Sequence, residues 1–542
     1  MKRKSTARQQ QNIINTRNRS KKLWLVLGVM FAIIIVYSPV FQNNILYGWD
    51  DGEYFKIPAV QQPSFQRLAE VFTDFHLGMY QPVAVLSFSI NRMITGDASW
   101  GFILVNVLLH LINVFLVFKL ALHLTKRDIP ALFAALIFGI HPMNVEAVAW
   151  ISTRSSGLFS MFYLLALLQY CRYLADTQVK TKLYSTFALF LLALFSKSMA
   201  VSLPFVLVLL DYYYQRILSG SALLEKLPFV GLSVIFGLIS VKAAGTFGHI
   251  ELLETQYTFI DRIMLLSYAV SLYLTKFIVP VNLSVIYTYP EKTEGFLPLI
   301  YYLSIAIPIT MVFLFVILRR WRRELVFVLF FFVITLAPVL PFWWSRIFIA
   351  AERYVYIPYL GLFFLLAIFA GRVYSTADQL FSGGRQWLTT GIVCLIFWFA
   401  LTTFHRTKVW KDMPTLMEDV IDKQRSNSDL AFAWFFLGNY HERIGNPERA
   451  LKSYDLAVLR YPGHIQALNN RGILKGTKGD MEGAMADFNQ IIQLRPSWAE
   501  GWYNRGIVFY HSGKKEEACS DWQQSSALGF EQAALIHKQL CE

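Results

Sequence analysis

The sequence predicts an all-α protein, in which a bundle of membrane-spanning helices is followed by an α-solenoid of short helical repeats. Three observations lead to this prediction. The mean hydropathy of the 542 residues is +0.42, and 16% of them are charged, against roughly a quarter in soluble proteins. Apolar runs of spanning length, or nearly so, recur until about residue 404. Beyond that point the chain is amphipathic and repeats with a period of 34 residues.

The apolar runs predict about eleven membrane crossings. They lie near residues 23–41, 102–122, 130–146, 157–174, 183–197, 199–214, 227–244, 297–318, 325–341, 354–371 and 387–404. A further apolar stretch, 263–280, is predicted to be re-entrant or to lie along the outer surface. A full crossing there would place the basic cluster Arg319–Arg323 outside the cytoplasm, against the rule that cytoplasmic loops retain Lys and Arg.

Basic residues set the predicted orientation, with residues 1–22 as a cytoplasmic tail and 23–404 as the membrane domain. A signal peptide is the alternative for the N-terminus. Against it, the stretch 23–40 is long enough to span, and no small-x-small cleavage site follows. Eleven crossings place everything after residue 404 outside the cytoplasm. We therefore expect a multi-pass membrane protein.

The distribution of charge, the motifs that are missing and the cysteine spacing argue against several classes of protein. Much of the net charge of +14 lies in clusters that flank apolar runs, so nucleic-acid binding is not predicted. No Walker motif, Gly-rich dinucleotide loop or HExxH motif is present, which argues against a nucleotide-driven cytoplasmic enzyme. The four cysteines have no metal-ligand spacing, and a Cys519–Cys541 disulfide stays open.

The region after residue 404 is predicted to be a linker, 405–430, and three tetratricopeptide (TPR) units, 431–542. Small and aromatic residues recur every 34 positions, as expected where paired helices approach closely and pack on their neighbours. The recurring sets are Gly438, Gly472 and Gly506; Gly445, Gly479 and Gly513; Ala450, Ala484 and Ala518; and Tyr454, Phe488 and Trp522. Such a solenoid presents a concave surface suited to a protein or peptide partner.

A long outer loop, 42–101, is predicted between the first two crossings, and it opens with three carboxylates: Asp50, Asp51 and Glu53. Acidic loops outside a membrane are common and are often simply hydrated. Alternatively, a carboxylate at the membrane surface acts as general base on an acceptor hydroxyl or holds a divalent cation. From the loop alone, both interpretations stay open.

Other charged residues gather at predicted outer ends of crossings. His141, Glu146 and Arg154 lie between crossings three and four, Lys197 lies between two tight crossings, and Arg353 precedes a helix. Interfacial polar groups and snorkelling lysines account for many such positions. Ionisable groups at membrane depth nevertheless tend to mark function, and arginine suits a phosphate. Their shared face favours a binding site for an anionic substrate.

Five sequence segments, in this order, carry a family resemblance: WDDGEYF, YQPVAVLSFSINRMITG, FGIHPMNVEAVAWISTRSSGLFS, SKSMAVSLPFVLVLLDYY and AERYVYIPYLGLF. The chain resembles the multi-spanning GT-C glycosyltransferases fused to C-terminal TPR repeats, which include bacterial membrane proteins and the eukaryotic transmembrane-and-TPR O-mannosyltransferases. The resemblance implies an inverting transferase that uses a polyprenyl- or dolichyl-phosphate-linked sugar on the outer face.

The resemblance also implies roles for individual residues. Asp50 and Asp51 fall on the acidic motif whose carboxylate activates the acceptor hydroxyl, without a choice between the two. Arg154, Lys197 and Arg353 fall on motif positions suited to the leaving lipid phosphate. Two departures are visible: Ser152–Ser156 keeps only the arginine of an acidic-basic run, and Gln81 stands where relatives often have a basic residue or His.

We therefore predict a glycosyltransferase of a bacterial inner membrane that acts on an acceptor hydroxyl, such as that of Ser or Thr in a secreted protein. Its partners would be a lipid-linked sugar donor, membrane lipid and a protein bound by the TPR units. The sequence requires no metal or other cofactor, and a cation at the two aspartates stays open. The alternative is a non-catalytic membrane-anchored TPR scaffold for an envelope or secretion complex. A transporter is disfavoured because the polar groups cluster on one face rather than at the midplane.

Overall fold

The computed structural model describes residues 22–246, 251–252, 256–317, 322–342, 344–345, 348–380, 382–423 and 426–542. The predicted basic tail, apart from Lys22, and part of the basic cluster 319–323 lie outside these residues. The chain divides into two units: an N-terminal unit of Met1–Ile45 and Asp50–Asp412, and a C-terminal unit of Leu46–Trp49 and Met413–Glu542. Both are helical, which confirms the predicted fold class; one two-residue antiparallel pair joins β1 (Glu251–Leu252) to β2 (Trp344–Ser345).

Six helices of the described chain are long and apolar enough to cross a membrane. They are Lys22–Gln42, α6 (Ser99–Thr125), Ile151–Ala175 with α9 (Arg154–Ala175), Gly220–Gly245 with α13 (Leu227–Thr246), α18 (Tyr359–Leu380) and α19 (Gly384–Val409). A seventh candidate is α7 (Asp128–Ile140) together with Pro142–Ala149, a pair bent by 58°.

The other predicted crossings are shorter helices, and their number stays a prediction. They correspond to α10 (Lys180–Ser196), α11 (Leu203–Tyr213), α15 (Leu299–Leu303) with α16 (Ala306–Ile317), and α17 (Arg322–Leu336). The ambiguous stretch 263–280 lies largely in α14 (Phe259–Ile278), which begins with a capping box between Thr258 and Asp261.

The surface of the N-terminal unit indicates lipid as its solvent. In α19, 11% of the most apolar 18-residue window is buried, and in Lys22–Gln42 the share is 17%, although both windows are strongly apolar. A helix whose apolar residues are not covered by protein is unstable in water. The chain is therefore an integral membrane protein.

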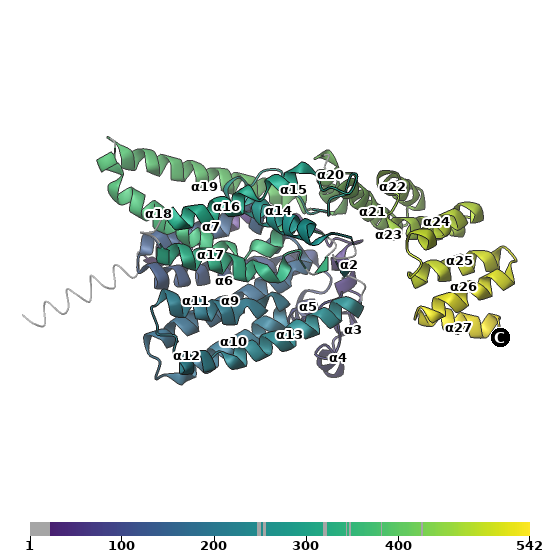
Figure 1. Ribbon diagram of the computed structural model, residues 1–542, viewed down its shortest axis with the longest axis horizontal. Coiled ribbons are helices and arrows are strands. Elements are labelled where there is room, and N and C mark those ends of the chain that lie inside the picture. The colour runs from purple at the N-terminus through teal and green to yellow at the C-terminus, as the bar shows by residue number, and fades with distance from the viewer. Residues whose placement is uncertain are drawn as a thin grey trace, which may run out of the picture. The chain divides into compact units, whose positions relative to one another are not determined.

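The helices of the N-terminal unit pack side by side around α9, which contacts α6 and α10 (Figure 1). A small residue permits the close approach of α9 and α6, because a Cβ added at Gly157 would lie 3.3 Å from Leu109. From α6 the packing continues through α7, α18, α17 and α11, each of which contacts the next. This packing brings the starts of α6 and α9 together.

Short elements build the loops of the N-terminal unit. Between residue 42 and α6 these are α2 (Asp50–Tyr54), α3 (Pro58–Gln61), α4 (Phe65–Glu70) and α5 (Pro82–Thr95), whereas η1 (Ser38–Gln42) forms the end of the span Lys22–Gln42. Elsewhere they are η2 (Pro142–Asn144), α8 (Glu146–Ala149), η3 (Ile151–Thr153), η4 (Ser198–Ser202), α12 (Gly220–Leu224), η7 (Ala337–Val339) and η8 (Glu352–Val355).

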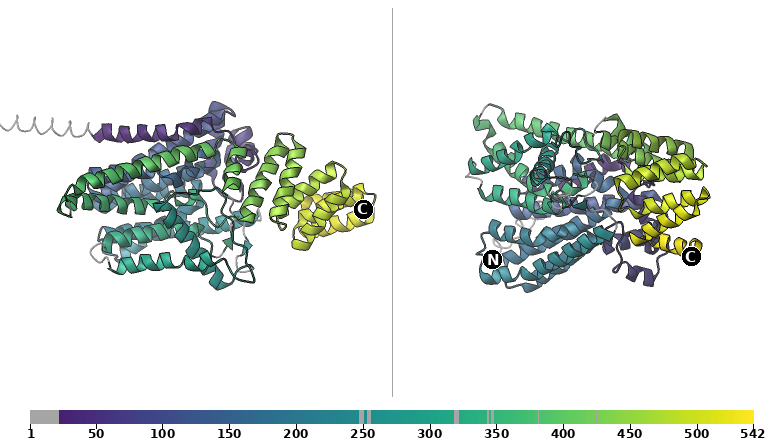
Figure 2. Two further views of the ribbon diagram at one scale, coloured as in Figure 1. Left: turned by 90° about the horizontal axis from the view of Figure 1, so that it is seen from above. Right: turned by 45° about the vertical axis from the view of Figure 1, so that its right-hand side comes forward.

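The C-terminal unit is a stack of paired helices (Figure 2). They are α20 (Met413–Asp422), α21 (Asn427–Arg443), α22 (Pro447–Arg460), α23 (Ile465–Thr477), α24 (Met481–Leu494), α25 (Ala499–His511), α26 (Lys515–Ala527) and α27 (Glu531–Leu540). The predicted linker 405–430 is thus mostly helical in its described part. The helices α21 to α26 form three consecutive pairs at the positions of the three predicted repeats, and the number of TPR units stays a prediction.

The repeat signature has a direct packing explanation. Within each repeat a glycine of the first helix faces an aromatic ring of the second, and a Cβ at Gly438, Gly472 or Gly506 would meet that ring at 2.3–2.9 Å. The helices therefore approach more closely than any larger residue permits. A disulfide joins Cys519 to Cys541, and thereby ties α26 to the end of α27.

Candidate functional site

The two adjacent aspartates occupy different environments at the start of α2. Asp51 is fully buried, and its Oδ1 accepts hydrogen bonds from the backbone N–H of Ser152, at 2.9 Å, and from the Ser152 hydroxyl. Asp50 is half-buried. Successive helical residues point about 100° apart, which is why neighbours in sequence differ so much here. The Asp51 carboxylate is therefore held by Ser152 of η3, whereas the Asp50 side chain is partly accessible to solvent.

Arg154, at the start of α9, is fully buried behind Asp51. Its guanidinium donates to four oxygens of neighbouring elements at 2.8–3.2 Å. The acceptors are the side-chain oxygens of Asn91 and Asn106 and the carbonyl oxygens of Ser87 and Phe102. Its face lies 4.3 Å from the centroid of the Phe88 ring. These contacts join α5, α6 and α9 behind the acidic pair, which favours a positioning role over direct contact with a substrate phosphate.

An ion pair between Glu146 and Arg353 lies near Asp50. Glu146 is buried at the start of α8, and its two carboxylate oxygens bind the Arg353 guanidinium and, at 2.8 Å, the Arg353 backbone N–H. Burial raises the pKa of Asp50 to about 6; Glu53 and Glu146 also raise it, whereas Arg353 lowers it. A carboxylate with this pKa is mostly ionised at neutral pH yet accepts a proton readily.

Lys197 and Arg353 are linked by one aromatic ring. The ammonium of Lys197 lies 5.9 Å from the Tyr354 ring centroid and donates to Ser156 Oγ at 2.8 Å. The Arg353 guanidinium lies 5.1 Å from the same centroid and 5.2 Å from that of Trp150. The Arg353 side chain is 18% exposed, so the two cations form a partly accessible, aromatic-lined patch.

His141 stands apart from this arrangement. It lies at the bend after α7, fully buried among aromatic rings that include Phe277 and Phe399. Its Nδ1 accepts from the Met143 backbone N–H at 3.3 Å, which leaves Nε2 as the donor to the Phe277 carbonyl at 3.1 Å. With both ring nitrogens engaged by backbone, His141 stabilises the bend, which argues against the substrate contact expected from the sequence.

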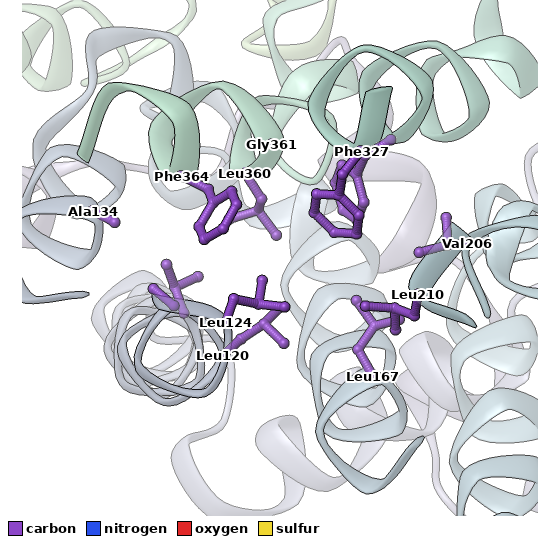
Figure 3. Close-up of a pocket in the computed structure, with 13 residues that line it drawn as sticks. Leu120, Leu124, Ala134, Leu167, Val206, Leu210, Phe327, Leu360, Gly361 and Phe364 are labelled. Carbon is purple, nitrogen blue, oxygen red and sulfur yellow. The ribbon is translucent and has the colours of Figure 1, made fainter. Parts of the chain in front are cut away.

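An apolar cavity among the described residues lies elsewhere (Figure 3). It is lined by Leu120, Leu124, Leu167, Leu210, Phe327 and Phe364, among others, and no charged side chain reaches it. Leu120 lies fourteen residues after Asn106 on α6, about 21 Å along the helix axis. The cavity is therefore remote from the aspartates, and we exclude it from the candidate site.

Sequence reasoning missed several residues that shape this site. Ser152 binds Asp51, Asn91 and Asn106 hold Arg154, and Tyr354 joins the two cations. Uncharged side chains such as these carry no signal in a search for ionisable groups. The one available hint was the Ser-rich run around Arg154, which stands where acidic and basic residues were expected.

Comparisons with known proteins show what the two regions of the chain are similar to. Residues 81–244 match the family model described as dolichyl-phosphate-mannose-protein mannosyltransferase, and residues 465–497 match a tetratricopeptide repeat. Human protein O-mannosyl-transferase TMTC1 is 25% identical over 450 residues, which cover 73% of this chain and 49% of that protein.

Two further relatives are similar. Human protein O-mannosyl-transferase TMTC3 is 25% identical over 427 residues, covering 72% of this chain and 46% of that protein. Protein O-mannosyl-transferase Tmtc1 of Drosophila melanogaster is 36% identical over 125 residues, 23% of this chain and 14% of that protein. The chain spans about half the length of the human relatives. It is therefore an integral membrane protein whose membrane region is similar to the dolichyl-phosphate-mannose-protein mannosyltransferases and whose C-terminal region consists of tetratricopeptide repeats.

Proposed function

We propose that the chain is an inverting membrane glycosyltransferase of GT-C type, which transfers a sugar from a polyprenyl-phosphate-linked donor to an acceptor hydroxyl. The observation that carries the proposal is the half-buried carboxylate of Asp50, with its pKa raised to about 6, beside the Glu146–Arg353 pair. The similarity to protein O-mannosyl-transferases supports mannose as the sugar and a Ser or Thr hydroxyl as the acceptor.

Asp50 is the general base in this mechanism. Its carboxylate takes the proton of the acceptor hydroxyl while the acceptor oxygen forms a bond to the anomeric carbon. The bond from that carbon to the phosphate oxygen breaks on the opposite side, which inverts the anomeric configuration. The lipid phosphate leaves with its electron pair and gains negative charge, and the Arg353 and Lys197 patch stabilises that charge.

The other candidate residues hold this arrangement in place. Asp51 accepts from Ser152 and so fixes the start of α2 against η3. Arg154 ties α5, α6 and α9 together behind it. Glu146 orients Arg353 through two contacts. Of the two aspartates that the sequence leaves equivalent, the accessible one is thus the better base.

We also propose that the TPR unit lies outside the cytoplasm. The Cys519–Cys541 disulfide supports this location, because disulfides persist in oxidising compartments and are rare in the cytosol. The test is alkylation of whole cells followed by mass measurement with and without reductant. We expect Cys519 and Cys541 to be bonded to each other and Cys394 to be alkylated as a free thiol. Free thiols at both Cys519 and Cys541 in freshly lysed cells would overturn this orientation.

The decisive experiment compares transfer by the purified full-length protein and its Asp50→Asn variant. The donor is dolichyl-phosphate mannose with a labelled sugar, and the acceptors are Ser- and Thr-containing peptides. Mass spectrometry of glycoproteins and glycolipids from a deletion strain identifies the natural product. Loss of both the product and the labelled transfer in the variant is expected.

The three TPR repeats favour one rival, a non-catalytic scaffold that assembles a protein complex. Complementation separates the two functions. If Asp50→Asn and Asp51→Asn, singly and together, restore the parent phenotype and its glycans while deletion of the TPR unit does not, the transferase proposal is wrong and the scaffold is supported.

A further inference from the structure

Four residues from the N-terminal half of the chain belong to the C-terminal unit. The chain leaves the N-terminal unit after Ile45, contributes Leu46–Trp49 to the TPR unit, and returns at Asp50. Leu46 is 1% exposed and Trp49 is 9% exposed, so this short segment is well packed. The next peptide bond after Trp49 leads directly to the proposed base.

The segment packs on α21, the first helix of the first repeat, which Figure 1 labels. The Trp49 ring stacks on Phe436, with ring centroids 4.6 Å apart and an interplanar angle of 18°. The Arg443 guanidinium lies 4.2 Å from the Tyr47 ring centroid. Phe436 and Arg443 are seven residues apart and therefore lie on one face of the helix.

Gly48 makes the close approach possible. Its φ is +95°, in the region that glycine tolerates and other residues rarely adopt. A Cβ added there would also lie 3.1 Å from the backbone nitrogen of Tyr440. Both the backbone conformation and the available space thus require glycine between the two aromatic residues that contact α21.

The contact residues on α21 are particular to the first repeat. At the position of Phe436 the next two repeats carry Asn470 and Asn504, and at the position of Arg443 they carry Thr477 and His511. The general TPR framework therefore does not explain an aromatic side chain and an arginine here. The segment Leu46–Trp49 does, because it supplies the rings that both of them contact.

We propose that the first TPR repeat is a positioning device for catalysis, which fixes the backbone that carries Asp50 through the stack of Trp49 on Phe436. This inference rests on the proposed transferase function. Trp49 and Phe436 are positioning residues, because they act through Asp50 and not on substrate. A displacement of about 1 Å in a reacting group lowers rates by up to about 100-fold, so an anchor one residue away has a large effect.

The first test uses Phe436→Asn in the full-length protein. Asparagine is the native residue at this position in the next two repeats, so the repeat is expected to fold. Hydrogen exchange of residues 46–55 is expected to rise in this variant. The matched control is Leu459→Ala, which truncates an apolar side chain of the same repeat that is 72% exposed; it should leave exchange in this segment unchanged.

Kinetics provide the second readout. Phe436→Asn is expected to lower kcat by about tenfold or more, with KM for dolichyl-phosphate mannose within about twofold of the parent value. The acidic limb of the pH–kcat profile should move to lower pH, because a less buried Asp50 has a lower pKa. Phe436→Tyr keeps a ring for the stack and should restore kcat and the pH profile.

The outcomes are distinguishable. Unchanged exchange in residues 46–55 overturns the anchor, whatever the activity. Raised exchange with unchanged kcat and pH profile overturns its catalytic role. If the parent protein transfers no sugar, the proposed function is wrong and the catalytic role falls with it, whereas the exchange data still decide whether the anchor exists. Raised exchange, lowered kcat and rescue by Phe436→Tyr together support the proposal.

Discussion

Two groups of buried charges in the described part of the N-terminal unit differ in how completely their carboxylates are paired. In the α11–α12 cluster, Asp211 contacts Lys226 at 2.5 Å and the Tyr170 hydroxyl at 2.6 Å. The second carboxylate there is paired as fully. Glu225 accepts from Arg216 and Lys180, each at 2.9 Å, and from the Tyr173 hydroxyl at 2.6 Å.

The α2 cluster, formed by Asp50, Asp51, Glu146, Arg154 and Arg353, is different. Asp51 and Glu146 are engaged by Ser152 and Arg353, but Asp50 is half-buried, and its pKa is raised to about 6. The comparison teaches that burial and charge alone do not mark chemistry, because structural ion-pair networks share them. An accessible carboxylate with a raised pKa is the feature that separates the two clusters.

The largest expected effect is on Asp50. Asp50→Asn removes the base and keeps the size of the side chain, so transfer should fall about 10²- to 10⁴-fold. The unfolding temperature should stay close to the parent value. Labelled-sugar transfer and thermal unfolding in detergent measure the two quantities. Glu53→Gln is the matched control, because Glu53 is exposed and pairs with Lys56. Equal losses in both variants would refute the assignment of Asp50.

The α11–α12 cluster should respond in the opposite way. Lys226→Met removes the cation that lies 2.5 Å from Asp211, so among the described residues the carboxylate keeps only the Tyr170 hydroxyl and the more distant Arg216, at 3.5 Å. Loss of a partner from a buried ion pair costs about 3 kcal/mol or more. We therefore expect a lower unfolding temperature and an unchanged kcat for the protein that stays folded. A large loss of kcat at unchanged stability would show that this cluster also takes part in the reaction.

A pH profile tests the electrostatics of the α2 cluster. Arg353 lowers the pKa of Asp50, so Arg353→Gln should raise it above about 6. The base is active when ionised, and its acidic limb in kcat/KM should move to higher pH by about one unit. Arg216→Gln, in the α11–α12 cluster, should leave the limb in place. A limb that does not move in Arg353→Gln would exclude Asp50 as the group that it reports.

The sequence predicted the parts of the molecule that depend on periodicity. The 34-residue register located the glycine–aromatic contacts of the repeats, and the apolar runs located most membrane helices. It did not choose between Asp50 and Asp51, because that choice depends on which of them faces Ser152 across 101 residues of chain. Nor did it place Trp49 on α21. Such contacts depend on how distant segments pack, and one chain carries no periodic signal of that.

The smallest loss of activity is expected for a substitution at Ser152, which binds Asp51. This substitution compares the buried aspartate with the accessible one. Ser152→Ala removes the hydroxyl that binds Asp51 but keeps the backbone N–H bond at 2.9 Å. One hydrogen bond to a charged group contributes about 1.5–3 kcal/mol. Since the N–H bond remains, we expect activity to fall by about tenfold or less. Ser152→Thr keeps a hydroxyl and is the rescue variant. If Ser152→Ala were as damaging as Asp50→Asn, the hydroxyl would take part in proton transfer, and the division between an accessible base and a buried positioning carboxylate would be wrong.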